Sequence, residues 1–159
     1  MWNSGKETGV KVEVLNEGTF SVWSAMRQQL WDHHTDEKDQ ADFVRYQKGS
    51  AEGTAISFLA VVEEGRHVGF LDAELRSDYV GGAERSPVWY VEGIFVVPEE
   101  RGKGVGRRLI ETLEAHARSQ GYSEIASDCD LDDTMSEAFH KAVGFREAAR
   151  NIHLIKRIS

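Results

Sequence analysis

The stretch Val96–Arg108 constrains the fold more than any other part of the chain. An apolar run ends at Pro98, a glycine-rich turn follows it, and residues at helical spacing come next. Such a turn leaves backbone N–H groups unpaired at the positive end of the helix dipole. Glycines also remove the side chains that would keep a phosphate away from these groups. The stretch predicts either a phosphate-binding turn between a strand and a helix, or a flexible surface turn before an ordinary helix.

The glycine spacing narrows the class of phosphate that this turn could bind. The chain has no G-x-x-x-x-G-K-[ST] run, and Arg107 occupies the place of the third glycine in G-x-G-x-x-G. The pattern present is Arg-x-x-Gly-x-Gly, formed by Arg101, Gly104 and Gly106. With the preceding Val-Pro, it resembles motif A of the GCN5-related N-acetyltransferases (GNAT), which holds the pyrophosphate of acetyl-CoA.

Length and composition indicate an ordinary globular protein. The chain has 159 residues, of which 40% are hydrophobic and 29% are charged, enough for a sizeable core. We expect one domain over 1–159, with 1–9 as a loose leader. No apolar stretch approaches a membrane span, so no membrane partner is expected. Cys129 is the only cysteine, which suits a reducing compartment and predicts a cytoplasmic location.

The net charge and its distribution along the chain indicate which classes of partner to expect. The net charge of −8 argues against a nucleic-acid partner, which would select the opposite sign. Basic residues gather over 101–108, beside the predicted turn, whereas acidic residues gather over 128–133 and 72–84. An anionic cofactor and a cationic small-molecule substrate would each meet complementary charge.

The remaining sequence predicts a mixed α/β fold with neither a βαβ repeat nor a barrel pattern. Strands are expected over Val10–Leu15, Ala55–Glu63, His67–Arg76, Val88–Val97 and Ser123–Ser127, and helices over 20–31, Asp36–Lys48, Gly104–Gln120 and Asp133–Val143. Two final strands or a hairpin are expected from Phe145 onward. The order β-α-α-β-β-β-α-β-α-β-β is also the order of the GNAT fold.

A closer resemblance runs from about Leu30 to Lys156. It is carried, in order, by Leu30-Trp31-Asp32-His33-His34, Arg76-Ser77-Asp78-Tyr79-Val80-Gly81-Gly82, Val91-Glu92-Gly93-Ile94-Phe95-Val96, Ala126-Ser127-Asp128 and His140-Lys141-Ala142-Val143-Gly144-Phe145. Together these stretches are similar to the aminoglycoside 6′-N-acetyltransferases. The resemblance implies acetyl-CoA as co-substrate, a cationic aminoglycoside as acceptor, and a homodimer, for which the apolar run Ile152–Ile158 could supply an edge strand.

Glu92 stands out within the apolar strand before the turn. Alternate strand residues share a face, so Glu92 would interrupt an apolar row formed by Val88, Tyr90, Ile94 and Val96. A carboxylate there must be paired or must line a polar cleft. Gly93 beside it suggests a bulge, which would splay the strands and free N–H groups for an acyl carbonyl and the pantetheine amides.

Asp128 follows the next strand and can face Glu92 across such a splay. Two carboxylates there could hold an alkylammonium ion and take its proton. The alternatives are an ion pair of Glu92 with a nearby arginine, and a helix or turn cap for Asp128.

The resemblance also implies a substrate wall. Trp31 and Tyr79 match the family's aromatic contacts with sugar rings, and His34 matches a further substrate contact. Core packing of the aromatic rings and a solvated loop histidine are the alternatives. His33-His34 with Asp36 has no further ligands at suitable spacing, so no metal is expected.

Cofactor residues are likewise implied by the resemblance. Backbone groups of Ile94, Phe95 and Val96 would bind acetyl-CoA, and its pyrophosphate would lie on the loop made of Arg101, Gly102, Lys103, Gly104, Val105, Gly106 and Arg107. Asp133 stands where relatives commonly show Asn beside the pantetheine arm, but a carboxylate lacks the amide donor. His140 stands where the wider family often has a tyrosine that protonates the departing thiolate. It could serve as that acid or be a spectator.

These expectations describe direct attack of a neutral amine on the thioester within one ternary complex. Two other functions fit the same cofactor turn. One is acetylation of another amine, such as a polyamine or a peptide N-terminus, and the other is a non-catalytic CoA-binding module. The acidic and aromatic residues favour the aminoglycoside.

Overall fold

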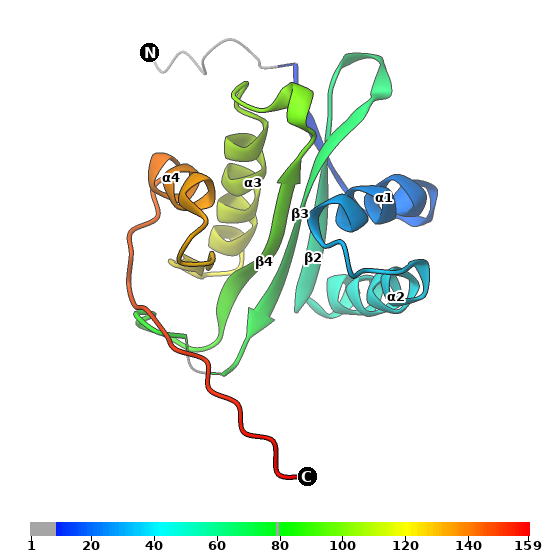
Figure 1. Ribbon diagram of the computed structural model, residues 1–159. Coiled ribbons are helices and arrows are strands. Elements are labelled where there is room, and N and C mark those ends of the chain that lie inside the picture. The colour runs from blue at the N-terminus through cyan, green and yellow to red at the C-terminus, as the bar shows by residue number, and fades with distance from the viewer. Residues whose placement is uncertain (1–8, 79) are drawn as a thin grey trace, which may run out of the picture.

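The fold is a five-stranded mixed sheet with helices on both faces, seen in a computed structural model that describes residues 9–78 and 80–159 (Figure 1). Tyr79 and most of the expected leader therefore lie outside the described residues. The strands are β1 (Lys11–Val14), β2 (Ala55–Val61), β3 (His67–Arg76), β4 (Val88–Val96) and β5 (Ile125–Ala126), and the helices are α1 (Phe20–Leu30), α2 (Asp36–Glu52), α3 (Val105–Ser119) and α4 (Thr134–Ala142). Short 3₁₀ turns lie at Glu17–Thr19, Glu63–Gly65 and Pro98–Glu100.

The sheet runs in the order β1-β2-β3-β4-β5, antiparallel except for the parallel pair β4–β5. Helices α1 and α2 cover one face, and α3 and α4 lie on the other (Figure 1). Each face has its own apolar core. Fully buried Trp23 of α1 and Phe70 of β3 belong to one core, whereas fully buried Leu109 of α3 and Trp89 of β4 belong to the other.

Local sequence signals explain where the helices begin and end. Thr35 accepts a hydrogen bond from the Lys38 amide at the start of α2, which ends at Gly53 with φ of +79°. Helix α3 starts after Gly104, with φ of +88°, and the chain turns away at Gly121, with φ of +86°. The predicted C-terminal glycine of α3 is thus confirmed, while α2 runs four residues beyond its expected end at Lys48.

A bulge in β4 confirms one prediction and overturns another. Asp72 pairs with Gly93 while Ala73 pairs with Val91, so Glu92 is the extra residue. An extra residue reverses the alternation of side chains beyond it. Ile94 and Val96 consequently pack into the core under α3, on the opposite face from Phe95. The expected single row of Val88, Tyr90, Glu92, Ile94 and Val96 is therefore wrong.

The two strands expected after Phe145 are not formed. Residues 143–159 contain neither helix nor strand, and the chain runs away from the sheet toward its C-terminus (Figure 1). Ile152, Leu154, Ile155 and Ile158 are each at least 86% exposed. A strand needs a partner edge, and β5 offers only the two residues Ile125 and Ala126, fewer than the expected Ser123–Ser127. Within the described ranges, no helix is long and apolar enough to cross a membrane.

Candidate active site

The turn between β4 and α3 exposes a row of backbone amides. Gly102 and Gly104 both adopt positive φ, +77° and +88°, which only glycine enters without strain. Within residues 9–78 and 80–159, no hydrogen-bond acceptor is found for the backbone amides of residues 102–107. Apart from its two neighbours in sequence, no described residue has an atom within 4 Å of a Cβ built on Gly102. Unpaired amides at a helix N-terminus with open space above them fit a diphosphate.

The basic side chains around this turn are exposed, but two of them also brace it. Arg101 Nε donates to the Val96 carbonyl oxygen at 2.8 Å, and Arg107 Nη2 donates to the Ala142 carbonyl oxygen at 2.8 Å. The Nζ atom of Lys103 lies 3.4 Å from Glu100 Oε2. The turn is thus fixed to β4 on one side and to α4 on the other, with a positive rim.

Gly106 and Asp133 have roles that the motif did not reveal. A Cβ on Gly106 would lie 2.8 Å from the ring of Phe139, so this glycine lets α3 and α4 approach. Asp133 Oδ1 accepts a hydrogen bond from the Ser136 amide at 3.0 Å and caps α4. Its carboxylate is therefore already engaged, and its expected contact with the cofactor stays a prediction.

Strand β4 parts from β5 next to this turn. The two strands pair only at Trp89–Ile125 and Tyr90–Ala126. Beyond Tyr90, the described part of β5 provides no partner for β4, so that edge of Ile94, Phe95 and Val96 is open, while β3 pairs with their other edge. This is the splay that was expected to admit a thioester, and it begins directly before the bulge at Glu92.

Both predicted catalytic carboxylates lie around Tyr90. Glu92 forms a bidentate ion pair with Arg76, with Nε–Oε1 of 2.7 Å and Nη2–Oε2 of 2.6 Å. The Arg76 guanidinium carbon lies 3.6 Å from the centre of the Tyr90 ring. The Tyr90 hydroxyl donates to Asp128 Oδ2. The structure therefore brings Glu92 and Asp128 into one neighbourhood, and it also shows the arginine partner that was the alternative for Glu92.

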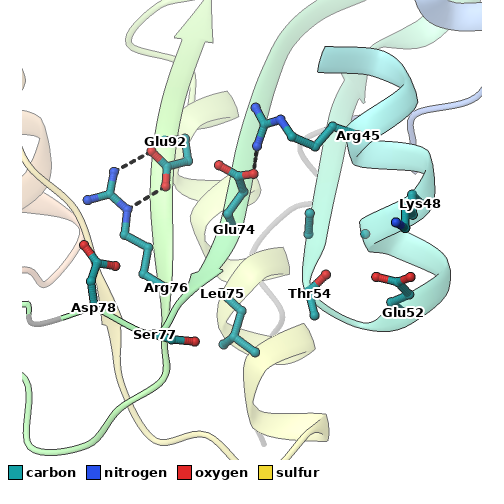
Figure 2. Close-up of a pocket in the computed structure, with 12 residues that line it drawn as sticks. Arg45, Lys48, Glu52, Thr54, Glu74, Leu75, Arg76, Ser77, Asp78 and Glu92 are labelled. Atoms are coloured by element: carbon teal, nitrogen blue, oxygen red, sulfur yellow. Dashed lines mark hydrogen bonds and ion pairs between the residues drawn. The ribbon is translucent and has the colours of Figure 1, made fainter. Parts of the chain in front are cut away.

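A cavity of about 530 Å³ opens beside Glu92, between the C-terminal half of α2 and the ends of β2 and β3 (Figure 2). It is lined by acidic and basic side chains in nearly equal number: Glu52, Glu74, Asp78, Glu92, Arg45, Lys48 and Arg76. Two of the three cations are already paired, Arg45 with Glu74 and Arg76 with Glu92 (Figure 2). The lining carries one more acid than base, which suits a polar, positively charged ligand.

Trp31 and His34 stand together near the bulge. Their rings stack with centroids 4.7 Å apart, and a Cβ on Gly93 would collide with the Trp31 indole. His34 Nδ1 lies 3.1 Å from Asp39 Oδ1. The structure therefore places Trp31 and His34 beside β4, on the same face as Glu92, whereas the third expected wall residue, Tyr79, lies outside the described residues.

A buried charge cluster behind this wall was missed in the sequence. The Arg27 guanidinium pairs with Asp39 at 2.9 Å and also with Asp42 and Asp72, and its side chain is 3% exposed. Burial pushes the pKa of Asp39 up, but hydrogen bonds from Ser24, His34 and Arg27 outweigh this and hold it below the usual value. The signal was a charged residue within each of two apolar runs, Arg27 and Asp72.

His34, Asp39 and Asp42 also form a group whose ligand atoms lie within 4.8 Å of one another. Such a group could in principle bind a cation. Here the guanidinium of Arg27 already supplies the positive charge between the two carboxylates. The cluster is therefore a side-chain ion network with Arg27 at its centre.

His140 is buried and held by two serines. Its Nδ1 lies 2.7 Å from the Ser136 carbonyl oxygen, which can only accept, and its Nε2 lies 2.7 Å from Ser127 Oγ. The neutral ring therefore carries its proton on Nδ1 and accepts from Ser127 at Nε2. Any proton that His140 provides to the site would have to pass through Ser127.

Comparisons with known proteins agree with this geometry. A family model described as "Acetyltransferase (GNAT) family" matches residues 23–145. Aminoglycoside N(6′)-acetyltransferase type 1 of Salmonella enteritidis is 38% identical over 146 residues, which cover 92% of this chain and 98% of that protein. The Acinetobacter baumannii protein of the same name is 34% identical, with coverages of 91% and 96%.

Two solved structures show the same likeness in three dimensions. AAC(6′)-Iy, bound to the bisubstrate analogue CoA-S-monomethyl-acetylneamine, superposes with a TM-score of 0.86 at 36% identity, covering 93% of this chain and 98% of that chain. AAC(6′)-Ih from Acinetobacter baumannii gives a TM-score of 0.83 at 32% identity, with coverages of 95% and 100%. With the amide-lined turn, the parted strands β4 and β5 and the predicted element order through α4, these matches show that the chain belongs to the GNAT acetyltransferase family.

Proposed function

We propose that this acetyltransferase is an aminoglycoside 6′-N-acetyltransferase, which transfers the acetyl group of acetyl-CoA to a primary amine of a cationic aminoglycoside. One observation carries the proposal within the structure. A polar pocket with Glu92 on its wall and one more acidic than basic side chain lies on the face of the sheet where Trp31 and His34 lie. The curated relatives named above as aminoglycoside acetyltransferases span most of the chain.

The residues around the β4–α3 turn fit acetyl-CoA. Amides of residues 102–107 would bind its diphosphate, with the rim of Arg101, Lys103 and Arg107 opposing the negative charge. The open edge of β4 over 94–96 would bind the amides of the pantetheine arm. When bound, acetyl-CoA supplies the acetyl group as an activated thioester.

The acceptor amine needs a base. Alkylamines are mostly protonated near neutral pH, and an acidic pocket favours the ammonium form further. Glu92 or Asp128 would remove that proton before the nitrogen attacks. Backbone N–H groups at the open edge of β4 would stabilise the developing oxyanion.

The departing thiolate must be protonated by the protein or stabilised by water. His140 would supply the proton as a general acid when both ring nitrogens are protonated, because Nε2 can then donate to Ser127 Oγ, which would relay the proton. Cys129 has no part in this account. Desolvation raises the pKa of its thiol, so the thiolate nucleophile needed for acyl transfer is disfavoured, and direct transfer needs no carrier.

We further propose that the chain acts as a cytoplasmic homodimer of one-domain copies. Ile152, Leu154, Ile155 and Ile158 form an exposed apolar run that nothing within the described residues covers. An extended run of this kind could pair with the sheet edge of a second copy. Sedimentation of the full chain against a chain ending at Arg150 tests this, because only the full chain should form dimers.

A kinetic panel tests the proposed reaction. Acetyl transfer from acetyl-CoA is measured with tobramycin, kanamycin, spermidine and a short peptide, each with release of free CoA thiol as readout. The proposal expects kcat/KM for the aminoglycosides to exceed that for the other amines. Preference for spermidine or the peptide would identify an acetyltransferase for another amine. Tight binding of acetyl-CoA in calorimetry, with no transfer to any amine, would identify a non-catalytic CoA-binding module.

A further inference from the structure

We propose that Arg76 and Tyr90 are positioning residues that give the two carboxylates different roles. Arg76 commits Glu92 to binding the substrate, and Tyr90 presents Asp128 as the base. This inference rests on the proposed function, because it assigns the steps of that reaction to individual side chains. It decides between Glu92 and Asp128, which the sequence left equivalent.

Both carboxylate oxygens of Glu92 are already engaged by Arg76. Each of its oxygens accepts a hydrogen bond from Arg76, at 2.7 Å and 2.6 Å. A carboxylate held bidentately by a guanidinium is strongly stabilised as the anion. Each oxygen keeps a second lone pair, so Glu92 can still accept a hydrogen bond from a substrate ammonium or hydroxyl group. It can orient a ligand without taking a proton from it.

Tyr90 connects this ion pair to Asp128. The ring lies against the Arg76 guanidinium, with 3.6 Å between the guanidinium carbon and the ring centre. This stacking fixes the plane of the ring and therefore the direction of its hydroxyl group. That hydroxyl donates to Asp128 Oδ2. Desolvation, and then the neighbouring Asp128, raise the pKa of Tyr90, so it remains a donor at working pH.

Asp128 depends on that donor for its position. It is exposed and lies in the irregular segment after β5. In the described part of the chain, Tyr90 is the one side chain that hydrogen-bonds to it, and no arginine or lysine pairs with it. A neutral donor on Oδ2 brings no positive charge to the carboxylate and leaves Oδ1 open. Tyr90 thus positions Asp128 as Arg76 positions Glu92, but Tyr90 places no positive charge beside the carboxylate.

The proton transfer follows from this geometry. The substrate ammonium passes one proton from nitrogen to Asp128 Oδ1, which becomes a carboxylic acid. The lone pair left on nitrogen is then free to attack the thioester carbonyl carbon, and the electrons of the broken C–S bond leave with the sulfur. A second proton from the nitrogen is lost as the amide forms, and the sulfur gains one to become the thiol. Protons and charge balance without any further reactant.

The two roles predict opposite kinetic signatures. Asp128→Asn should lower kcat about 100-fold or more, with a smaller change in the Kd of tobramycin for the cofactor-free protein. Glu92→Gln removes the anion and Arg76→Lys loosens its hold, so each should raise that Kd about tenfold and should lower kcat less than Asp128→Asn does. Calorimetry on the cofactor-free protein gives Kd independently of activity. The reverse pattern, with the larger kcat loss in Glu92→Gln, would overturn the assignment.

Tyr90→Phe tests the positioning role directly. It removes one hydroxyl group and keeps the ring under Arg76, so kcat should fall about tenfold while the KM of acetyl-CoA stays unchanged. In the Asp128→Asn background, the same change should cost almost nothing more, because Tyr90 acts through Asp128. Tyr122→Phe, at a half-buried tyrosine between α3 and β5, is the matched control and should match the wild type.

Additive losses in the double variant would show that Tyr90 supports the fold in some other way, and would refute its positioning role. A failure of the proposed function can be told apart from a failure of this assignment. If the wild type acetylates no aminoglycoside, the reaction itself is wrong. If the wild type is active but the variants show reversed or additive effects, only the division of roles is wrong.

Discussion

Replacing Arg27 by methionine is the most demanding test of how this fold is held together. The side chain is 3% exposed and joins α1 to α2 through Asp39 and Asp42, and to β3 through Asp72. Methionine nearly fills the aliphatic part of the space but brings no charge. The variant therefore leaves three carboxylates facing one another, of which Asp39 and Asp72 have side chains at most 1% exposed.

The magnitude follows from the desolvation of those carboxylates. Removing one partner of a buried ion pair costs about 3–5 kcal/mol, because the remaining charge stays buried and uncompensated. Here hydrogen bonds remain, from Ser24 to Asp39 at 2.7 Å and from Ser57 to Asp72 at 2.6 Å. These bonds reduce the loss in the free energy of unfolding, whereas repulsion among the three carboxylates increases it. We expect a decrease of about 4 kcal/mol, a large part of the roughly 5–15 kcal/mol typical of a domain.

Urea unfolding followed by tryptophan fluorescence measures this loss. With an m-value of about 2 kcal/mol per M, the midpoint of Arg27→Met should fall by about 2 M. Arg45→Met is the matched control, since Arg45 also contacts Asp42, at 3.4 Å, but its side chain is 49% exposed. An exposed pair contributes about 0.2–1 kcal/mol. Equal small losses in both variants, below about 1 kcal/mol, would refute the claim that the buried network stabilises the fold.

Three further predictions concern pH, packing and the leaving group. Because the folded-state pKa of Asp39 is depressed, its stabilising contribution is complete above the usual value of about 3.9 and is lost as pH falls through the folded pKa. Urea midpoints should therefore decrease below about pH 4, and less so in Asp39→Asn. Gly93→Ala should push Trp31 aside, costing about 1–3 kcal/mol and weakening tobramycin binding in calorimetry. Ser127→Ala should lower kcat about tenfold with unchanged CoA affinity, whereas Ser136→Ala, which keeps the carbonyl partner of His140, should not.

The sequence predicts the elements well where one local signal decides them. Glycines with positive φ delimit α3, and β2 and β3 form the expected antiparallel pair around the short turn at Glu63–Gly65. The end of β5 and the C-terminal run could not be predicted in this way. Whether a run such as Ile152–Ile158 becomes a strand depends on a partner edge, which is a property of the assembled sheet or of a second copy rather than of the run itself.

The site was predicted in its residue types but not in its pairings. Glu92 and Asp128 could be singled out because charges within or after apolar strands need an explanation. Their partners could not, since Arg76 lies 16 positions before Glu92 and Tyr90 lies 38 positions before Asp128. Ile94 and Val96 were assigned to the wrong face although a bulge was expected, because a bulge of one residue inverts every position after it.

That bulge joins the stability of the fold to the chemistry of the site. Asp72, a partner of Arg27, pairs with Gly93 in the β3–β4 register, and Glu92 is the neighbouring extra residue. The indole of Trp31 lies against Gly93 and near the Arg27 guanidinium, 5.0 Å from its carbon. The buried ions therefore hold β3, the bulge and the aromatic wall in one packed unit. A change at Arg27 should consequently shift Trp31 even in variants that remain folded. Arg27→Lys should therefore weaken tobramycin binding in calorimetry by more than the decrease in its folded fraction explains.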